Sequence, residues 1–294
     1  MRNSIVLQIS CFLQSVNAKL VKWRIVRPTV IVPVDGGICS QMVAYLRGQY
    51  YAEKGINAQY DLCWFRGMAK DTNGLFDRPF ELQMLFPDLT IHQPSRLAAW
   101  WYRHFMKPLV PYDMLPDRET IHRSVYLNAY LEFRDNRWFA DAFKHYFPIE
   151  KAITSSALVL PTENMHRCAV HIRRGDMSYV KFEGYENSLD YFVKAMRYVQ
   201  TKYKKVRFFL FSDEPDWVLK KLCPLIPGFD VQMISGNMGH VDLLLAAQCE
   251  TIIASQGTMG RMAGLLNREA ELIIPPTGDW GSFHIEKYRP VERF

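Results

Sequence analysis

The C-terminal part of the chain alternates short apolar runs with longer segments of helical character. The helical segments begin near residues 187, 212, 240 and 259, between runs that start at residues 168, 206, 230, 251 and 271 and read CAVHI, VRFFLF, DVQMI, TIIAS and ELIIP. Strands that alternate with helices form parallel sheets in which a helix connects consecutive strands. This pattern predicts a doubly wound α/β lobe.

A second, shorter alternation begins near residue 28. The run TVIVPV is bounded by Pro28 and by the pair Gly36 and Gly37, as expected for a buried parallel strand. We expect Ser40 to cap the helix that follows, and Gly55 to lie just beyond its C-terminus. INAQYDL is then the second strand of a β-α-β unit.

These two alternations predict two lobes. The chain has 294 residues, of which 49% are hydrophobic, enough for more than one ordinary domain. We expect a basic N-terminal helix over 1–27, an N-terminal α/β lobe over 28–155 and a C-terminal Rossmann-like lobe over 156–294. The segment from about 75 to 150 has no clean period, so helices and loops are expected there. A cleft between the lobes is the default ligand site.

The first 24 residues form an amphipathic pattern without any acidic residue. Its apolar members recur at helical spacing and are Ile5, Ile9, Phe12, Val16, Leu20 and Trp23. Glutamines and serines interrupt the stretch too often for a signal peptide or a membrane span. Either the helix packs on the body of the protein, or it rests on an anionic membrane surface through its basic residues Arg2, Lys19, Lys22 and Arg24.

Net charge and cysteine content exclude few classes of binding partner and suggest a cellular compartment. The formal net charge of +6 favours anionic partners, and no recognisable nucleic-acid-binding module is present, so nucleic acid is not predicted as a partner. The six cysteines lie far apart and form no CxxC pair. A reduced, cytoplasmic protein is the simplest interpretation.

The strand CAVHI ends in the most informative residues of the chain. Ligands of open α/β sheets bind beyond the carboxyl ends of the strands, where His171, Arg173, Arg174 and Asp176 are expected. The guanidinium group of arginine matches phosphate oxygens, so two arginines here favour a diphosphate ligand. The alternative is that Arg173 and Asp176 pair with each other and with neighbouring acids at a turn.

Two further strand ends belong to the same predicted edge. In FSDEPDW, Ser212 or Asp213 is positioned to cap a helix whose first turn contains Pro215. In TIIASQGTMGRMAG, Gly257 and Gly260 allow a helix N-terminus to approach an anion. The chain lacks GxGxxG, GxxxxGK[ST], HExxH, GxSxG and D-x-D motifs, which favours phosphate binding by arginine and backbone without a metal.

Four segments together resemble a known family. VHIRRGDM at 170–177 resembles the H-x-R-R-G-D signature of the bacterial α-1,2-fucosyltransferases, glycosyltransferase family 11. FFLFSDEPDWV and VDLLLAAQCETIIAS resemble the second and third blocks of that family, and DGGICSQMVAY resembles its N-terminal glycine-rich loop. Glu214 stands where the second block has another aspartate, and QGTMGRM differs from the family's usual sequence.

The resemblance implies a GT-B-like α/β fold of two Rossmann-like lobes with GDP-fucose held mainly by the C-terminal one. The implied reaction is an inverting transfer of L-fucose to the 2-hydroxyl of a terminal galactose, without a metal or other cofactor. The acceptor would be an oligosaccharide or a lipid-linked glycan such as an O-antigen repeat. The enzyme would then be cytoplasmic, in peripheral contact with the inner face of the bacterial inner membrane.

The resemblance also assigns roles to individual residues. Arg173 is expected to bind the β-phosphate as negative charge develops there, with Arg174 beside it. The remaining donor-binding residues are expected to be Ser212, Asp213, Ser255, Gly36 and Gly37. For the general base, four residues stay open: His171, Asp176, Asp35 and Glu132.

Two alternatives keep the fold and change the function. One is a GDP-fucose enzyme that forms an α-1,6 bond, because related fucosyltransferases share the H-x-R-R core. The other is a non-catalytic protein that binds glycans or phosphates. Hydrolysis of GDP-fucose in the absence of acceptor would exclude the second.

Overall fold

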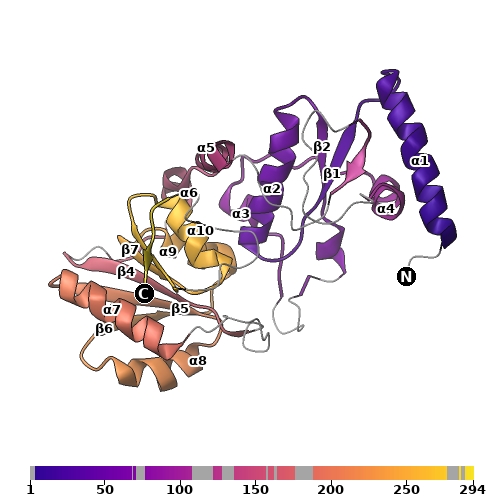
Figure 1. Ribbon diagram of the computed structural model, residues 1–294. Helices are drawn as coiled ribbons and strands as arrows, with labels where there is room; N and C mark the ends of the chain where they lie inside the picture. The colour runs from indigo at the N-terminus through magenta and orange to yellow at the C-terminus, as the bar shows by residue number, and fades with distance from the viewer. Residues whose placement is uncertain are drawn as a thin grey trace. The chain divides into compact units, whose positions relative to one another are not determined.

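A computed structural model describes residues 4–67, 69–70, 77–107, 122–127, 136–156, 158–161, 164–175, 188–276, 285 and 289–294. The chain forms two compact units (Figure 1). The N-terminal unit comprises 1–70, 77–80 and 88–135, and the C-terminal unit comprises 71–76, 81–87 and 136–294. Each unit contains a parallel sheet with helices, which confirms the predicted GT-B-like α/β class with two lobes.

The N-terminal unit contains a three-stranded parallel sheet in the order β2-β1-β3. The strands are β1 (Thr29–Pro33), β2 (Asn57–Asp61) and β3 (Val125–Tyr126), and α2 (Ile38–Ala52) connects the first two. The predicted β-α-β unit is therefore confirmed. The unit also contains α1 (Ser4–Lys22), the 3₁₀ helix η1 (Cys63–Arg66) and α4 (Arg96–Phe105).

The cap predicted for α2 is wrong, whereas its C-terminal glycine is confirmed. Gly36 has a φ of +69°, and the helix begins directly after Gly37, which is its N-cap residue. Ser40 therefore lies inside the first turn and is exposed. Gly55 has a φ of +75°, and its N–H donates to the carbonyl of Ala52 at the end of the helix.

The C-terminal unit contains a six-stranded sheet in the order β6-β5-β4-β7-β8-β9, in which every neighbouring pair is parallel. Its strands are β4 (His166–Ile172), β5 (Val206–Ser212), β6 (Asp230–Ile234), β7 (Thr251–Ala254), β8 (Glu271–Ile274) and β9 (Glu292–Arg293). The first five of these coincide with the apolar runs of the sequence, so the predicted doubly wound lobe is confirmed.

Helices cover both faces of this sheet. They are α7 (Leu189–Lys202), α8 (Pro215–Trp217) with the segments η4 (Val218–Leu222) and η5 (Cys223–Leu225), α9 (Gly239–Ala246) and α10 (Thr258–Leu266). In Figure 1, α7 and α8 lie on one face of the sheet and α9 and α10 on the other. On the first face, Cys168, Val170 and Ile172 of β4 pack with Phe192 and Met196 of α7 in one buried cluster.

The boundary between the units differs from the prediction at residue 155. The helices α5 (Asn136–Tyr146) and α6 (Ile149–Ser156) belong to the C-terminal unit, as does the short helix α3 (Leu82–Leu85). Phe139 and Phe143 are fully buried in α5, and Phe147 packs against Phe86 with ring centroids 5.0 Å apart. Aromatic packing therefore assigns this segment to the second unit, which the aperiodic sequence did not indicate.

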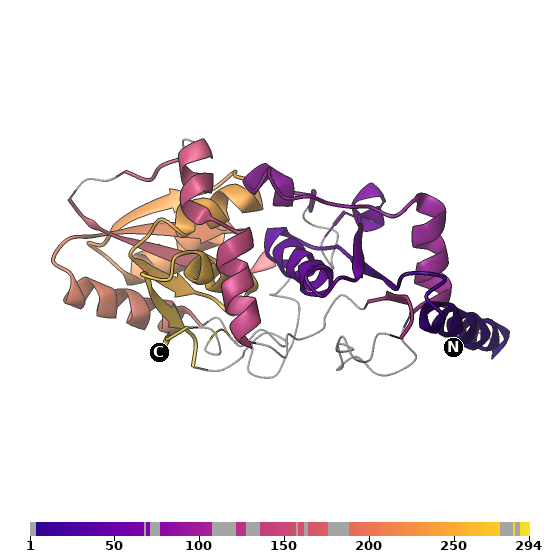
Figure 2. The ribbon, with the colours of Figure 1, turned by 90° about the horizontal axis from the view of Figure 1, so that it is seen from above.

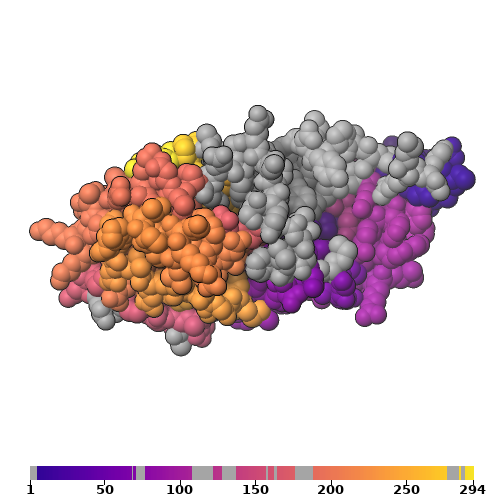
Figure 3. Space-filling model, turned by 90° about the horizontal axis from the view of Figure 1, so that it is seen from below, coloured from indigo at the N-terminus to yellow at the C-terminus, as the bar shows by residue number. Residues whose placement is uncertain are grey.

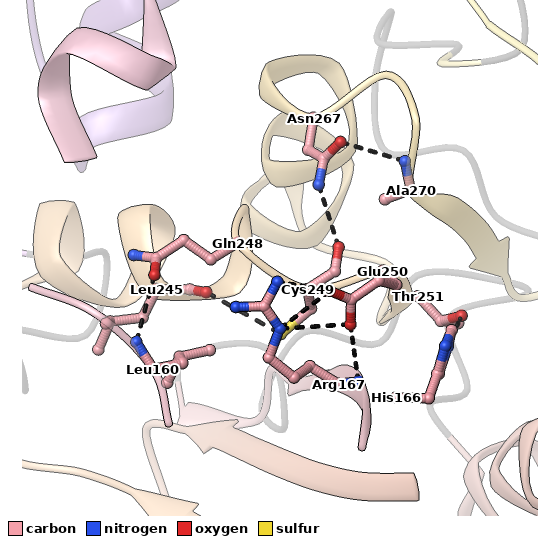
Figure 4. A network of polar contacts seen from close by, with 10 residues as sticks. All are labelled: Leu160, His166, Arg167, Leu245, Gln248, Cys249, Glu250, Thr251, Asn267 and Ala270. Atoms are coloured by element: carbon pink, nitrogen blue, oxygen red, sulfur yellow. Dashed lines mark hydrogen bonds and ion pairs between the residues drawn. The ribbon is translucent and has the colours of Figure 1, made fainter. Parts of the chain in front are cut away.

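A polar network fixes the amino ends of β4 and β7 (Figure 4). Arg167 of β4 forms an ion pair with Glu250, whose carboxylate also accepts the backbone N–H of Arg167 at 2.7 Å. Gln248 accepts a hydrogen bond from the N–H of Leu160 at 3.2 Å. This ion pair lies at the opposite ends of the strands from the arginines of the predicted site.

Candidate active site

Three loops of the C-terminal unit meet where β4, β5 and β7 end. In the parallel register, His171 pairs with Phe211 of β5 on one side and with Ala254 of β7 on the other. The connections leave β4 and β7 in opposite directions along the sheet, so the gap between their ends is a topological switch point. This is the position at which open α/β sheets bind their ligands.

Arg173 is held at this point by both neighbouring loops. Its backbone N–H donates to Ser255 Oγ at 3.2 Å, and its Nη1 donates to Asp213 Oδ2 at 2.5 Å. The Arg173 side chain is 18% exposed and that of Asp213 is 11% exposed, so the pair is largely shielded from water. The geometry fixes the position of one of the five donors of the guanidinium group.

Arg174 is fixed by the same loop of β5. Its backbone N–H donates to Asp213 Oδ1 at 2.9 Å, and its Nε donates to Glu214 Oε2 at 3.0 Å. Its guanidinium carbon lies 3.7 Å from the centre of the Trp217 ring, which is a cation–π contact. Asp213 thus contacts both arginines, as the alternative interpretation of an arginine–acid turn expected, while Asp176 and Glu132 lie outside the described residues.

The helix-cap roles predicted for Ser212 and Asp213 are wrong. The N-cap of α8 is Glu214, and the Asp213 carboxylate is occupied by the two arginines. Ser212 Oγ donates to the carbonyl of Ile172 at 2.9 Å and accepts the N–H of Glu214 at 3.1 Å. Ser212 therefore ties the end of β5 to the end of β4 and shapes the loop that carries Asp213.

His171 is a buried, neutral side chain in this arrangement. It is 5% exposed, and its Nδ1 lies 3.0 Å from Ser255 Oγ. Burial lowers the pKa of its imidazole to about 3, and the positive charge of Arg173 adds to that effect. The backbone N–H of Ser255 also donates to the carbonyl of His171 at 3.0 Å. His171 and Ser255 together brace the turn that presents Arg173.

Two glycines bring the N-terminus of α10 close to β4 and β7. A Cβ atom on Gly257, the N-cap residue, would lie 3.5 Å from the side chain of Arg173. A Cβ atom on Gly260 would lie only 2.6 Å from the Cβ of Ala254 and 2.9 Å from its Cα. The backbone N–H groups at the start of α10 therefore lie beside Arg173, which suits an anionic ligand.

The N-terminal unit has its own loop at a strand end, after β1. Gln41 Nε2 donates to the carbonyls of Gly36 at 3.0 Å and Pro79 at 2.9 Å, which fixes the loop that contains Gly36 and Gly37. Partial burial raises the pKa of the Asp35 carboxyl above its ordinary value, and the positive charge of Arg47 offsets part of that rise. The structure thus brings Arg173, Arg174, Ser212, Asp213 and Ser255 together, and places Gly36 and Gly37 in the other unit.

Three contributors were not among the predicted site residues. Glu214 and Trp217 hold Arg174, and Gln41 fixes the glycine loop. The sequence signal that could have identified Trp217 is its position three residues after FSDE, because an aromatic ring in the helix that follows this loop can stack on Arg174. Within the described residues, no group of three or more His, Cys, Asp or Glu side chains is arranged to hold a metal ion.

Paired arginines, a helix N-terminus and a switch point define the class of α/β proteins that bind phosphorylated or nucleotide ligands at their strand ends. Residues 119–289 match the profile described as "Glycosyl transferase family 11". That match covers more than half of the chain, and the protein belongs to this family. The predicted family is thereby confirmed.

Curated relatives match part of the chain. The "Alpha-1,2-colitosyltransferase" of Escherichia coli is 31% identical over 115 residues, which are 37% of this chain and 39% of that protein. The "O-antigen biosynthesis glycosyltransferase WbnK" of Escherichia coli is 26% identical over 124 residues, which are 40% of each. The chain therefore matches about two fifths of the length of these relatives.

Solved structures resemble the chain distantly. POFUT1 in complex with GDP has a TM-score of 0.43 at 8% identity, with 91% of this chain and 99% of that chain covered. The E. coli heptosyltransferase WaaC with ADP has a TM-score of 0.43 at 10% identity, with 90% and 93% covered. Likeness at this level identifies no function.

Proposed function

We propose that the protein transfers L-fucose from GDP-β-L-fucose to the 2-hydroxyl of a terminal galactose on a glycan such as an O-antigen repeat, with inversion and without a metal. Membership of glycosyl transferase family 11 supports a glycosyltransferase. The relatives named for α-1,2-colitosyl transfer and for O-antigen biosynthesis support the linkage and the acceptor class. The arginine pair beside the N-terminus of α10 is the observation that carries the proposal.

In this proposal, Arg173 stabilises the departing diphosphate. The acceptor oxygen attacks C1 of the sugar, the bond between C1 and the β-phosphate oxygen breaks, and GDP leaves with the electron pair. Asp213 holds the guanidinium of Arg173 at 2.5 Å before the donor binds, so the donor meets an ordered cation. Arg174, held by Glu214 and Trp217, supplies a second positive charge at the same strand end.

The proton of the acceptor hydroxyl requires a base. His171 has a pKa of about 3 and hydrogen-bonds Ser255, so we assign it to positioning Arg173. Asp35 has a raised pKa, which makes its carboxylate a stronger base than an ordinary aspartate. We therefore propose Asp35 as the base among the described candidates.

A second donor has a specific observation in its favour. The relative that is 31% identical transfers colitose, which is fucose without its 3-hydroxyl group. The phosphate-binding residues proposed above would serve either donor, because both sugars leave the same kind of diphosphate.

The test is a transfer assay with the purified chain and a galactose-terminated oligosaccharide. GDP-L-fucose, GDP-colitose and GDP-mannose are supplied separately, each with and without EDTA, and product linkage is determined by NMR. We expect transfer from GDP-L-fucose to the 2-hydroxyl at an unchanged rate in EDTA. Faster transfer from GDP-colitose would mean that colitose is the sugar transferred. An α-1,6 product would mean that the proposed linkage is wrong. An absence of both transfer and donor hydrolysis would favour a non-catalytic binding protein.

A further inference from the structure

Helix α1 packs on the N-terminal unit through its polar side. Gln14 Nε2 donates to the carbonyls of Phe105 at 2.7 Å and Lys107 at 3.1 Å. Asn17 Oδ1 accepts the backbone N–H of Ser124 at 2.7 Å. Ser10 and Gln14 are almost completely buried, and α1 lies alongside α4 in both ribbon views (Figures 1 and 2). The helix is therefore a fixed part of this unit.

The opposite side of α1 is apolar and exposed. Ile5 is 68% exposed and Phe12 is 67% exposed, and Ile9 and Val16 continue the same stripe at spacings of three and four residues. The turn that follows adds Trp23 at 65% and Ile25 at 64%. We call the stripe formed by Ile5, Ile9, Phe12 and Val16 the outer face. Figure 3 shows α1 in indigo at the margin of the N-terminal unit.

This arrangement reverses the usual packing of an amphipathic helix. Surface helices normally bury their apolar stripe and expose their polar one. An exposed apolar stripe of this kind is typical of a site that binds a protein or a membrane. Since hydrogen bonds from Gln14 and Asn17 hold the polar side inward, the helix cannot bury its outer face on its own unit without breaking them.

The charges beside the outer face favour an anionic partner. The basic residues Lys19, Lys22, Arg24 and Arg27 are all exposed, at the same end of the helix as Trp23 and Ile25. The sequence contains no acidic residue before Asp35. Two copies of this surface would bring like charges together, whereas phospholipid head groups would neutralise them.

We propose that the outer face of α1 binds the surface of an anionic phospholipid membrane, with the helix lying in the plane of the interface. The 19 residues of α1 form a rod of about 28 Å, which presents the apolar stripe to the acyl boundary along its length. No helix in the part of the chain that the structure describes is both long and apolar enough to cross a bilayer. The proposal does not depend on the sugar that the enzyme transfers.

The experiment is flotation of the purified full chain with vesicles. Vesicles of phosphatidylglycerol and phosphatidylcholine are compared with vesicles of phosphatidylcholine alone, at low and high salt. We expect binding to the anionic vesicles that weakens with salt. The double variant Ile5→Ser with Phe12→Ser should lower the partition coefficient at least about tenfold, because two large apolar side chains no longer enter the interface.

Two further variants separate charge from hydrophobicity and from general surface changes. Lys19→Gln with Lys22→Gln should weaken binding to the anionic vesicles and leave any binding to pure phosphatidylcholine unchanged. The matched control is Leu219→Ser with Leu225→Ser, which removes two exposed leucines, 49% and 43% exposed, from the other unit. This control should float like the wild type.

Two results would overturn the proposal. One is a wild-type chain that stays unbound to the anionic vesicles at low salt. The other is a wild-type dimer that Phe12→Ser converts to a monomer without any change in flotation, which would make the outer face a contact between two copies. Thermal unfolding of each variant shows whether it is folded, and the exposed positions of Ile5 and Phe12 predict unchanged transitions.

Discussion

After β4 the chain carries two arginines, whereas after β1 it carries an aspartate and two glycines. Both strands lie between two parallel neighbours, so each ends at the carboxyl edge of its own sheet. At the end of β4, the carboxylate of Asp213 holds the arginines. At the end of β1, the carboxylate of Asp35 has a raised pKa, which the charge of Arg47 partly offsets.

The fold and the residues make different contributions at these two strand ends. The shared topology provides two strand ends at which a ligand can bind. The residues give the two ends opposite properties, because one carries fixed cations and the other a carboxylate that holds its proton more tightly than usual. We therefore propose the end of β4 as the diphosphate site, and Asp35 at the end of β1 is tested separately as the base.

The largest effect is expected from Arg173→Ala. Because its guanidinium is assigned to the departing diphosphate, kcat/KM for the sugar nucleotide should fall by about 10² to 10³. The matched control is Arg207→Ala, which removes an arginine from the amino end of β5, where it pairs with Asp230 at 3.0 Å. A comparable loss in the control would contradict a specific role for the end of β4.

Asp35→Asn should lower kcat by about 10²-fold if this carboxylate is the base. Its raised pKa predicts that activity of the wild type declines as the pH falls through a value above 3.8, the ordinary pKa of aspartate, because the carboxylate becomes protonated there. The pH profile of kcat measures this decline. If kcat of Asp35→Asn declines at low pH in the same way as that of the wild type, another residue is the base.

In both units a glycine allows a helix to pack closely on a strand, and an added Cβ atom should be destabilising there. Gly260→Ala places a Cβ against the Ala254 backbone, and Gly48→Ala places one against the hydroxyl of Tyr60, which hydrogen-bonds the Tyr45 carbonyl. Each should lower the free energy of unfolding by about 1–3 kcal/mol. Gly67→Ala, with open space around its Cβ, is the control for urea unfolding. An unaffected Gly260→Ala protein would contradict the tight contact.

The burial of His171 in the C-terminal unit predicts a pH dependence of the free energy of unfolding. Its folded-state pKa of about 3 lies below the ordinary 6.5, so the unfolded chain binds the proton first as the pH falls. Stability should therefore decrease below pH 6.5, with a loss of about 2 kcal/mol between pH 7 and pH 5. Urea unfolding at both pH values should show a smaller loss in His171→Asn, and an equal loss would contradict the burial argument.

The smallest effect is expected from Trp217→Leu. The ring lies against the Arg174 guanidinium, and a cation–π contact near the protein surface contributes about 0.5–1 kcal/mol. GDP affinity should thus fall by about two- to fivefold, since Arg174 keeps its hydrogen bonds to Asp213 and Glu214. Titration of the variant with GDP measures this change, and a loss as large as that of Arg173→Ala would contradict the smaller role given to the Trp217 contact.

Much of the C-terminal fold was predictable from the sequence, because buried parallel strands are short, apolar and rich in β-branched residues. The same reasoning located the residues that follow β4, β5 and β7 at one edge of the sheet. It could not predict that Asp213 contacts both arginines, since that depends on the register between strands separated by about forty residues. Nor could it predict the burial of His171, which follows from the close approach of Gly260.

The N-terminal helix shows a second limit. Its amphipathic period was readable from Ile5 to Trp23, but periodicity does not say which side of a helix packs inward. Ordinarily the apolar side does so. Here the side-chain amides of Gln14 and Asn17 meet backbone groups of the unit, and those contacts involve residues about 90 or more positions away. Such long-range hydrogen bonds leave no signal in a local pattern.

The diphosphate site at the end of β4 is tested by calorimetric titration of GDP into the wild type, Arg173→Ala and Arg207→Ala, with EDTA present. GDP carries the diphosphate without the sugar, so it tests the end of β4 apart from donor and acceptor identity. We expect GDP to bind the wild type and Arg207→Ala, with affinity at least about tenfold weaker for Arg173→Ala. Equal affinity of all three proteins for GDP would contradict the assignment of the diphosphate to Arg173.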